Sequence, residues 1–246
     1  MKKETMVRIF KATVYLILFI ILIYSGAKIY HWHKENIKNS GMAENINKIA
    51  VTKNDAENKY IVDFNLLKNQ NNDTVAWIKV NGTNIEYPIV KAENNEFYLN
   101  HSFDKTENSA GWIFADYKNK FDGTDRNIVI YGHNRKDKSM FGSLKNILNP
   151  DWYNNAENSE IIFFAEDESC GYKVFSVYQT EKESYYIKTN FSSNNEFEKF
   201  LETIKKRSIK NFETDVSKAD SILTLSTCAD NDSYRVVLHA KKLNEI

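Results

Sequence analysis

The feature that most constrains the fold of this chain is a series of short apolar runs, separated by turn residues, that follows residue 74. The runs are rich in Val, Ile, Tyr and Phe, and Asn, Gly, Asp and Ser lie between them, as expected for strands joined by turns. The expected strands are residues 75–80, 85–90, 111–116, 127–131, 160–165, 172–179, 184–188, 221–227 and 234–242. Many short strands favour a closed or nearly closed β-barrel, commonly as one domain. The sequence therefore predicts a mostly β protein.

Helical patterns are few. The long helix expected in this region covers residues 194–207, and Ser193 with Glu196 forms a capping box at its start. Its buried face is expected to be Phe197, Phe200, Leu201 and Ile204. A shorter helix is expected at residues 59–69, because apolar residues recur there at helical spacing. Residues 94–100 are expected to form a short helix or a loop.

The last two expected strands carry reactive side chains. In SILTLSTCADNDSYRVVLHA, residues 221–240, Cys228 ends one strand and Arg235 starts the next. The turn-rich segment between them predicts a hairpin, which brings the thiol and the guanidinium to the same end of the sheet. Upstream, the strand in NIVIYGHN ends at Gly132 and is followed by His133. A thiol, an imidazole and an arginine at strand ends favour cysteine acyl-transfer chemistry.

Taken together, these motifs resemble the sortases, the cell-wall transpeptidases of Gram-positive bacteria. VAWIKVNGTNIEYPIV (75–90), NNEFYLNHSF (94–103) and GWIFAD (111–116) resemble the class B branch in order and spacing. The resemblance covers roughly residue 60 to the C-terminus. It implies a closed eight-stranded sortase-like β-barrel with N-terminal helices and one long crossing helix, preceded by a membrane anchor.

The residues and the resemblance together suggest a mechanism. A thiol reacts as its thiolate, and an ordinary pKa of ~8.5 leaves little thiolate at neutral pH unless a positive neighbour lowers it. In the interpretation that we favour, Cys228 attacks a peptide carbonyl and His133 protonates the departing amine, so that a thioester remains. An incoming amine then takes the acyl group. Arg235 is implied either to hydrogen-bond the developing oxyanion or to hold the substrate backbone.

The resemblance also implies a groove for the substrate peptide. Ser226 lies two residues before Cys228 and therefore faces the same side of its strand. The implied walls of the groove are Asn95, Tyr98 and Leu99 on one side and Tyr186 and Ile187 on the other. Many class B members have an acidic residue soon after the cysteine, and here both Asp230 and Asp232 are candidates.

The implied function is transpeptidation. The enzyme would cleave after Thr in a C-terminal sorting signal of the Asn-Pro-X-Thr-X or a related Pro-X-Thr type. The implied partners are surface proteins that bear this signal, and cell-wall peptidoglycan or its lipid-linked precursor as the source of the amine. Two alternatives remain open: a cysteine peptidase in which water resolves the thioester, and a non-catalytic, membrane-tethered binding barrel. The presence of Cys228, His133 and Arg235 together favours catalysis.

The N-terminal region is expected to anchor the chain in a membrane. Basic residues precede residues 12–27, which carry no charge, and Lys28, Tyr30 and Trp32 follow them. A cleaved signal peptide is the competing interpretation, because the strongest apolar core is short and Ser-Gly-Ala at residues 25–27 resembles a cleavage site.

The expected organisation has three parts. Residues 1–33 are assigned to a cytoplasmic tail and transmembrane anchor, residues 34–58 to a polar stalk, and residues 59–246 to the catalytic domain. The resemblance places this domain on the extracellular face of a single-pass membrane protein.

Charge and motif content argue against several other classes. The 33 basic and 33 acidic residues balance, which disfavours a nucleic-acid binder with a broad positive surface. The sequence lacks a glycine-rich phosphate loop and a close-spaced ligand pair such as CxxC or HxxxH, so we expect neither a nucleotide cofactor nor a zinc site. His101 and His239 are expected to be structural. A Cys170–Cys228 disulfide is disfavoured, because Cys170 lies in an apparent turn, DESCG, and Cys228 lies in the active-site motif.

Overall fold

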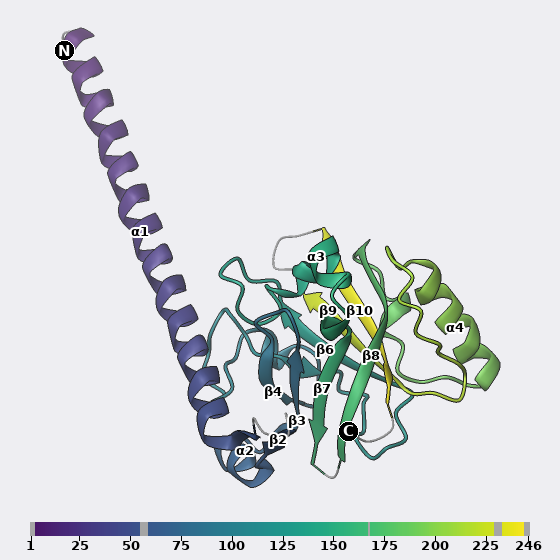
Figure 1. The fold of residues 1–246 in the computed structure, drawn as a ribbon. Coiled ribbons are helices and arrows are strands. Elements are labelled where there is room, and N and C mark those ends of the chain that lie inside the picture. Colours follow the sequence, from purple (N-terminus) through teal and green to yellow (C-terminus); the bar gives the residue numbers. More distant parts are fainter. Residues whose placement is uncertain (1–2, 55–58, 167, 229–232, 244–246) are drawn as a thin grey trace. The chain divides into compact units, whose positions relative to one another are not determined.

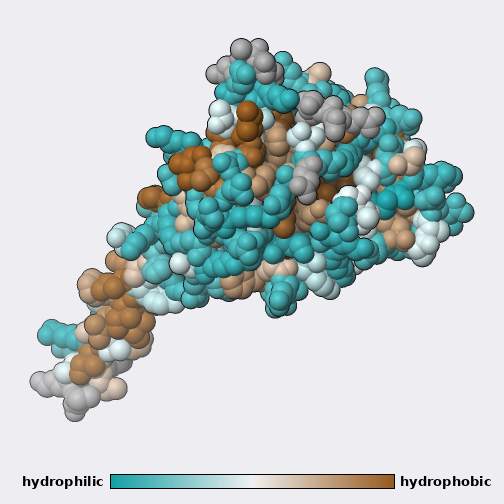
Figure 2. Space-filling view, turned by 90° about the horizontal axis from the view of Figure 1, so that it is seen from below, coloured by the Kyte–Doolittle hydropathy of each residue, from teal (hydrophilic) through white to brown (hydrophobic). Residues whose placement is uncertain are grey.

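The computed structural model describes residues 3–54, 59–166, 168–228 and 233–243 (Figure 1). The chain forms two compact units, Met1–Lys38 and Asn39–Ile246. Helix α1, Lys3–Ala50, is continuous from the first unit into the second. In the first unit, exposed apolar side chains cover this helix (Figure 2). By length and composition the helix can cross a membrane.

Within the described residues, eight strands of the second unit close a β-barrel. Their order round the barrel is β10-β8-β7-β3-β4-β5-β6-β9. The strands are β3 (Thr74–Val80), β4 (Glu86–Val90), β5 (Phe114–Ala115), β6 (Asn127–His133), β7 (Glu160–Ala165), β8 (Glu168–Glu181), β9 (Ile222–Cys228) and β10 (Tyr234–Lys242). The β4–β5 and β6–β9 pairs are parallel, and the other pairs are antiparallel. The predicted eight-stranded barrel is confirmed.

The second unit begins with the end of α1. Ala43, Ile46 and Ala50 on its last turns join the barrel core, and Ile46 is fully buried. Burying a side chain of this size stabilises a fold by about 1.5–3 kcal/mol. Asn47 adds two hydrogen bonds, from Nδ2 to Glu86 O (2.8 Å) and from Trp77 Nε1 to Oδ1 (3.0 Å). Part of the expected stalk is therefore packed on the barrel.

A small sheet replaces the start of the helix predicted at residues 59–69. Strands β1 (Val51–Asn54) and β2 (Lys59–Val62) pair in an antiparallel sheet, and the helix α2 starts only at Phe64 and ends at Gln70. The prediction is wrong for residues 59–62, because their burial alternates as in a strand and Asp63 caps the helix by accepting a hydrogen bond from Leu66 N.

The remaining helices lie in the connections between barrel strands. They are η1 (Phe97–Leu99), η2 (Leu144–Leu148), α3 (Pro150–Tyr153), η3 (Ala156–Ser159), η4 (Tyr185–Ile187) and α4 (Asn194–Lys206). Helix α4 confirms the predicted long helix, with Ser193 accepting from Glu196 N at its start. It lies beside β8 (Figure 1), and its predicted apolar face is buried there.

Three other expectations about local structure are corrected. Residues 184–188 form the 3-10 turn η4 and not a strand, because both edges of the adjacent β8 are already paired, with β7 and with β10. The strand expected at residues 111–116 shortens to β5, which pairs with β4 at a single position. Cys170 lies within β8, opposite Phe163 of β7, and not in a turn. Residues 168–170 pair with β7, which extends the strand through Cys170 and leaves its side chain almost fully buried.

Candidate active site

His133 and Cys228 end two neighbouring strands. Strands β6 and β9 run parallel, and their register pairs His133 with Cys228 as its last position. Parallel strands in register bring the side chains of paired residues to the same face and the same edge of the sheet. His133 is buried, whereas Cys228 is partly exposed. The predicted thiol and imidazole therefore lie side by side at one end of the barrel.

Arg235 reaches the same end from β10. Strands β9 and β10 are antiparallel with Val237 opposite Ser226, and extending this register by two residues places Arg235 opposite Cys228. The Arg235 terminal nitrogen Nη1 is buried and has no hydrogen-bond partner among the described residues. A buried guanidinium N–H without a partner is costly in free energy, and such groups are often kept for a ligand.

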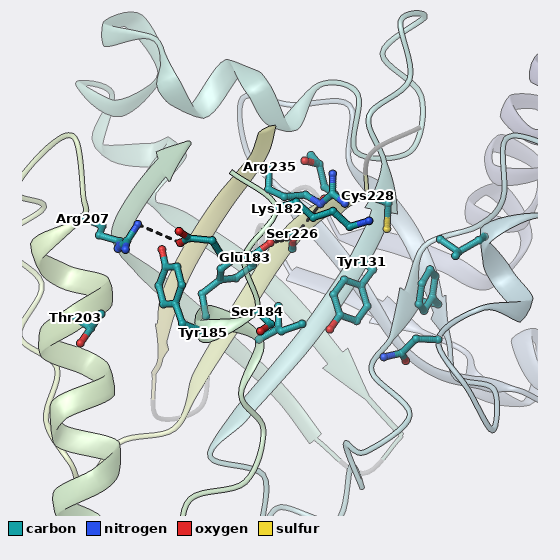
Figure 3. Close-up of a pocket in the computed structure, with 16 residues that line it drawn as sticks. Tyr131, Lys182, Glu183, Ser184, Tyr185, Thr203, Arg207, Ser226, Cys228 and Arg235 are labelled. Carbon is teal, nitrogen blue, oxygen red and sulfur yellow. Dashed lines mark hydrogen bonds and ion pairs between the residues drawn. The ribbon is translucent and has the colours of Figure 1, made fainter. Parts of the chain in front are cut away.

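A cavity of about 1010 Å³ opens beside Cys228 and Arg235. Of the expected site residues, it is lined by Cys228, Arg235, Ser226, Asn95, Leu99, Tyr186 and Ile187. Figure 3 shows Cys228 and Arg235 on the same side of this cavity, with Ser226 beside them. A space of this size suits a short peptide.

Two expected site residues, His133 and Tyr98, are not among the residues that line the cavity, although Cys228, the strand partner of His133, is. The Tyr98 side chain is buried in the core, where its hydroxyl donates to Asp73 and accepts from Asn71. Its neighbour Leu99 is the one that lines the cavity. Asp230 and Asp232 lie outside the residues that the structure describes.

The environment of His133 fixes which of its nitrogens carries hydrogen. Nε2 lies 2.6 Å from the carbonyl oxygen of Leu99, and because a carbonyl can only accept, Nε2 is the donor. Gly111 packs against the same edge of the ring: a Cβ on Gly111 would lie 2.8 Å from His133 Cδ2, the carbon bonded to Nε2, and 2.6 Å from Tyr98 O. Gly111 also has a φ of +60°, which favours glycine. The imidazole is thus held in one orientation.

The sequence comparison with known proteins agrees with this geometry. The family model for the sortase domain matches residues 78–243. Sortase B of Staphylococcus aureus is 32% identical over 239 residues, which cover 94% of this chain and 96% of that protein. This chain belongs to the sortase family. Sortase B of Listeria monocytogenes is 37% identical over 180 residues, which cover 71% of this sortase and 72% of the relative.

Solved structures place this sortase in class B. A Bacillus anthracis protein described as similar to sortase B superimposes with a TM-score of 0.76 and 35% identity, over 85% of this chain and 98% of that one. Clostridium perfringens sortase B superimposes with a TM-score of 0.69 and 36% identity, over 74% of this chain and 100% of that one. The predicted class and the predicted cysteine transpeptidase activity are confirmed. Sortases act on proteins with cell-wall sorting signals and on peptidoglycan precursors.

A buried carboxylate, which the sequence did not single out, supports one wall of the cavity of this sortase. Asp116 Oδ2 accepts hydrogen bonds from Asn95 Nδ2 (2.9 Å) and from the hydroxyl of Tyr131 (2.8 Å). Burial and the charge of Asp116 raise the pKa of Tyr131 far above its ordinary value, so its hydroxyl stays a donor. Both Asn95 and Tyr131 line the cavity. Of Asn95, Tyr131 and Asp116, the resemblance had named only Asn95 as a site residue. The hydrogen bond from Asn95 to Asp116 joins two loops, and no local pattern indicates it.

The opposite wall is tied to the strand that carries Cys228. The hydroxyl of Tyr186 lies 3.1 Å from Ser226 Oγ, and burial raises the pKa of this tyrosine. The wall then continues through residues 182–185 to the end of α4, where Arg207, the residue after the helix, has Nη1 3.5 Å from Glu183 Oε2 (Figure 3). Sequence reasoning missed this far end, because its charged residues come from two segments and carry no motif.

The other thiol and a second buried histidine of this sortase lie away from the cavity. Both cysteines are free, and burial raises the pKa of Cys170 to about 11. His239 is fully buried between Thr224 Oγ1 and the hydroxyl of Tyr178, each 2.9 Å from one ring nitrogen. Burial lowers the pKa of His239 to about 3, so it stays neutral.

Two further observations concern metal binding and His101. Among the described residues, no group of three or more His, Cys, Asp or Glu side chains is arranged to hold a metal ion. His101 stacks on Phe97 with ring centroids 4.0 Å apart, and its Nδ1 lies 2.7 Å from Phe97 O.

Proposed function

We propose that this sortase cleaves a C-terminal sorting signal after a threonine and joins the new carboxyl end to an amine of the cell wall. The observation that carries the proposal is the in-register pair of His133 and Cys228 beside a peptide-sized cavity that Arg235 also lines. A nucleophile, a proton carrier and an oxyanion donor at one strand edge are the parts that acyl transfer needs.

The proposed first half-reaction forms a thioester. The Cys228 thiolate adds to the carbonyl carbon of the threonine, and the Arg235 guanidinium donates to the oxygen as negative charge develops there. The carbon–nitrogen bond then breaks while the imidazolium of His133 gives a proton to the departing amine. Since Nε2–H is directed to Leu99 O, Nδ1 is the nitrogen assigned to this transfer.

The second half-reaction reverses these roles. An incoming amine attacks the thioester carbonyl, His133 accepts a proton from that amine, and the Cys228 thiolate leaves as the new amide forms. The proton given in the first half-reaction is thereby recovered, so the enzyme returns to its starting state. The acceptor is proposed to be a peptide amine of peptidoglycan or of its lipid-linked precursor. One solved sortase B, 33% identical to this chain, is described as complexed with triglycine, which suits an amine of this kind.

The substrate groove is proposed to lie between the two walls of the cavity. Leu99 and Ile187 offer apolar surface for a proline, while Asn95, Ser226 and Tyr186 offer hydrogen bonds to the peptide. These surfaces support a signal of the Asn-Pro-X-Thr-X or a related Pro-X-Thr type.

The N-terminal helix is proposed to be the membrane anchor, with the catalytic domain on the extracellular face. Its apolar length supports this assignment. Surface proteins with the sorting signal would then meet the enzyme as they leave the membrane.

The test is an assay of the full-length enzyme in detergent with quenched Pro-X-Thr peptides, with and without triglycine. The expected result is cleavage after threonine and, with triglycine present, a new amide identified by mass. His133→Ala is expected to lose both products, whereas Asn47→Ala, which replaces a side chain bonded to Glu86 and Trp77, should keep both. Cleavage without any amide product would support the peptidase alternative. If a folded enzyme bound but cut none of the peptides, the binding-barrel alternative would be favoured.

A further inference from the structure

Asn39 is a fully buried polar residue on α1, at the start of the second unit. Its Nδ2 donates to the carbonyl oxygen of Gly111 at 2.8 Å. Its Oδ1 accepts from Ser102 Oγ at 2.5 Å and from Asn108 Nδ2 at 2.9 Å. One side chain thus holds three points of the segment between η1 and β5. Buried amides with all these bonds made are strong local constraints, because losing a partner leaves the others unsatisfied.

The segment that Asn39 holds is also the one that seats His133. Gly111, whose carbonyl Asn39 binds, packs against Cδ2 of the imidazole and has no room for a Cβ. Gly111 N donates to Asn108 O (3.0 Å), so Asn39 binds both ends of this turn. A shift of the turn would therefore move the surface on which the His133 ring rests.

The same segment presents the carbonyl that fixes the His133 tautomer. Trp112 N donates to Tyr98 O at 2.9 Å, which ties the residue after Gly111 to the residue before Leu99. Leu99 O in turn accepts from His133 Nε2. Two contacts of the imidazole, one of packing and one of hydrogen bonding, thus depend on a segment whose position Asn39 sets.

We propose that Asn39 is a positioning residue for His133, acting through Gly111 and the Leu99 carbonyl. The inference rests on the proposed function, in which His133 carries the proton. Displacing a catalytic group by about 1 Å can cost on the order of 10²-fold in rate, so a residue that never touches substrate can still set kcat.

Asn47 provides a matched control on the same helix. Like Asn39, it donates Nδ2 to a backbone carbonyl and accepts at Oδ1, but its partners are Glu86 and Trp77 in β4 and β3. Asn47→Ala removes a similar set of bonds without touching the segment that packs against His133. It therefore separates a loss of packing from a loss of positioning.

The experiment compares full-length Asn39→Ala, Asn39→Asp, Asn47→Ala and His133→Ala in the triglycine assay, with thermal unfolding to confirm that each is folded. Asn39→Asp retains Oδ1 as an acceptor but replaces the donor to Gly111 with a carboxylate oxygen, so it breaks the Gly111 bond in a side chain of nearly the same size. The same proteins, labelled with ¹⁵N-histidine, report the His133 tautomer by NMR, with His133→Ala assigning the signal.

We expect Asn39→Ala and Asn39→Asp to lower kcat by about tenfold or more with KM within about twofold, and to give a mixture of His133 tautomers. Asn47→Ala should keep kcat and the Nε2–H tautomer. The inference is overturned if folded Asn39 variants keep both the wild-type kcat and the single Nε2–H tautomer. It is also overturned if Asn47→Ala lowers kcat as much as the Asn39 variants do. If His133→Ala itself stays active, the proposed function fails; if it is inactive while the Asn39 variants are not, this inference fails alone.

Discussion

The barrel strands carry two cysteines and two histidines, and among the described residues only Cys228 and His133 are paired across neighbouring strands. Cys228 lines the cavity and reaches solvent, and it is in register with His133 on the neighbouring parallel strand. In the barrel wall, Cys170 and His239 are buried within β8 and β10. The two thiols and the two imidazoles are therefore chemically alike, and they differ in their surroundings.

The partners of the two histidines differ in the same way. His239 has both ring nitrogens within hydrogen-bond distance of hydroxyl groups, and burial keeps it neutral. His133 directs Nε2 to a backbone carbonyl and has a thiol in the neighbouring strand. The proposed reactive pair thus lies at strand ends, and Cys228 lines the cavity, whereas Cys170 and His239 lie within strands and are buried.

The largest difference expected between the two places is in thiol reactivity. At pH 7 a thiol with a pKa of about 11 is thiolate in only ~10⁻⁴ of molecules, and Cys170 is also shielded from reagent. We expect iodoacetamide to modify Cys228 of the native enzyme at least ~10³-fold faster than Cys170, as measured by peptide mass spectrometry. Both should react in urea. Comparable rates in the native enzyme would break the comparison.

The next effect concerns Arg235. Arg235→Ala should lower kcat/KM by ~10²–10³-fold, the usual cost of losing an oxyanion donor. Arg126 provides the control, because it lies at the other end of β9, where its carbonyl accepts from Ile222 N and its guanidinium stacks on Phe197. Arg126→Ala should stay within about twofold in the peptide assay. Equal losses in both variants would mean that Arg235 acts only through the fold.

A smaller effect is expected from the carboxylate under the cavity wall. Asp116→Ala removes the acceptor that holds Asn95 and Tyr131, so we expect KM for the signal peptide to rise about tenfold, with kcat changed less. Asp125→Ala is the matched control, because this carboxylate also accepts several hydrogen bonds, but from Asn119 and the backbone N–H groups of Lys120 and Phe121. A KM change in the control as large as in Asp116→Ala would count against the role of this wall.

The smallest effect concerns His239 and acid stability. Its folded pKa of about 3 lies below the ordinary 6.5, so between these values the unfolded chain binds the extra proton. Stability from this group is present above pH 6.5 and is lost as the pH falls toward 3. From pH 7 to pH 5, wild type should lose about 2 kcal/mol more free energy of unfolding than His239→Gln, measured by urea titration. Parallel pH profiles would show that His239 is not held neutral.

Much of this arrangement follows from the sequence. The apolar runs of β6 and β9 predicted strands that end just before His133 and at Cys228, and the turn-rich segment after Cys228 predicted the hairpin to Arg235. The capping box at Ser193 predicted α4. These features are local, so the spacing of a few residues is enough to find them.

What the sequence did not reveal depends on contacts between distant segments. The β2 strand forms because residues 51–54 pair with it, which no local pattern at residues 59–62 indicates. Tyr98 and Leu99 are adjacent in sequence, yet one faces the core and the other the cavity. Asp116 and Asn39 form hydrogen bonds with residues that are distant in the sequence. In a sequence, buried polar residues of this kind look like ordinary surface residues.

The most direct test of the account is to identify the acyl-enzyme. The full-length enzyme would be mixed with a Pro-X-Thr signal peptide without an amine, quenched in acid, digested and analysed by mass spectrometry, beside Cys228→Ala and Cys170→Ala. We predict a peptide ending in threonine, linked as a thioester to Cys228, in wild type and in Cys170→Ala only. Cleavage that persists in Cys228→Ala, or an acyl group on any other residue, would contradict the account.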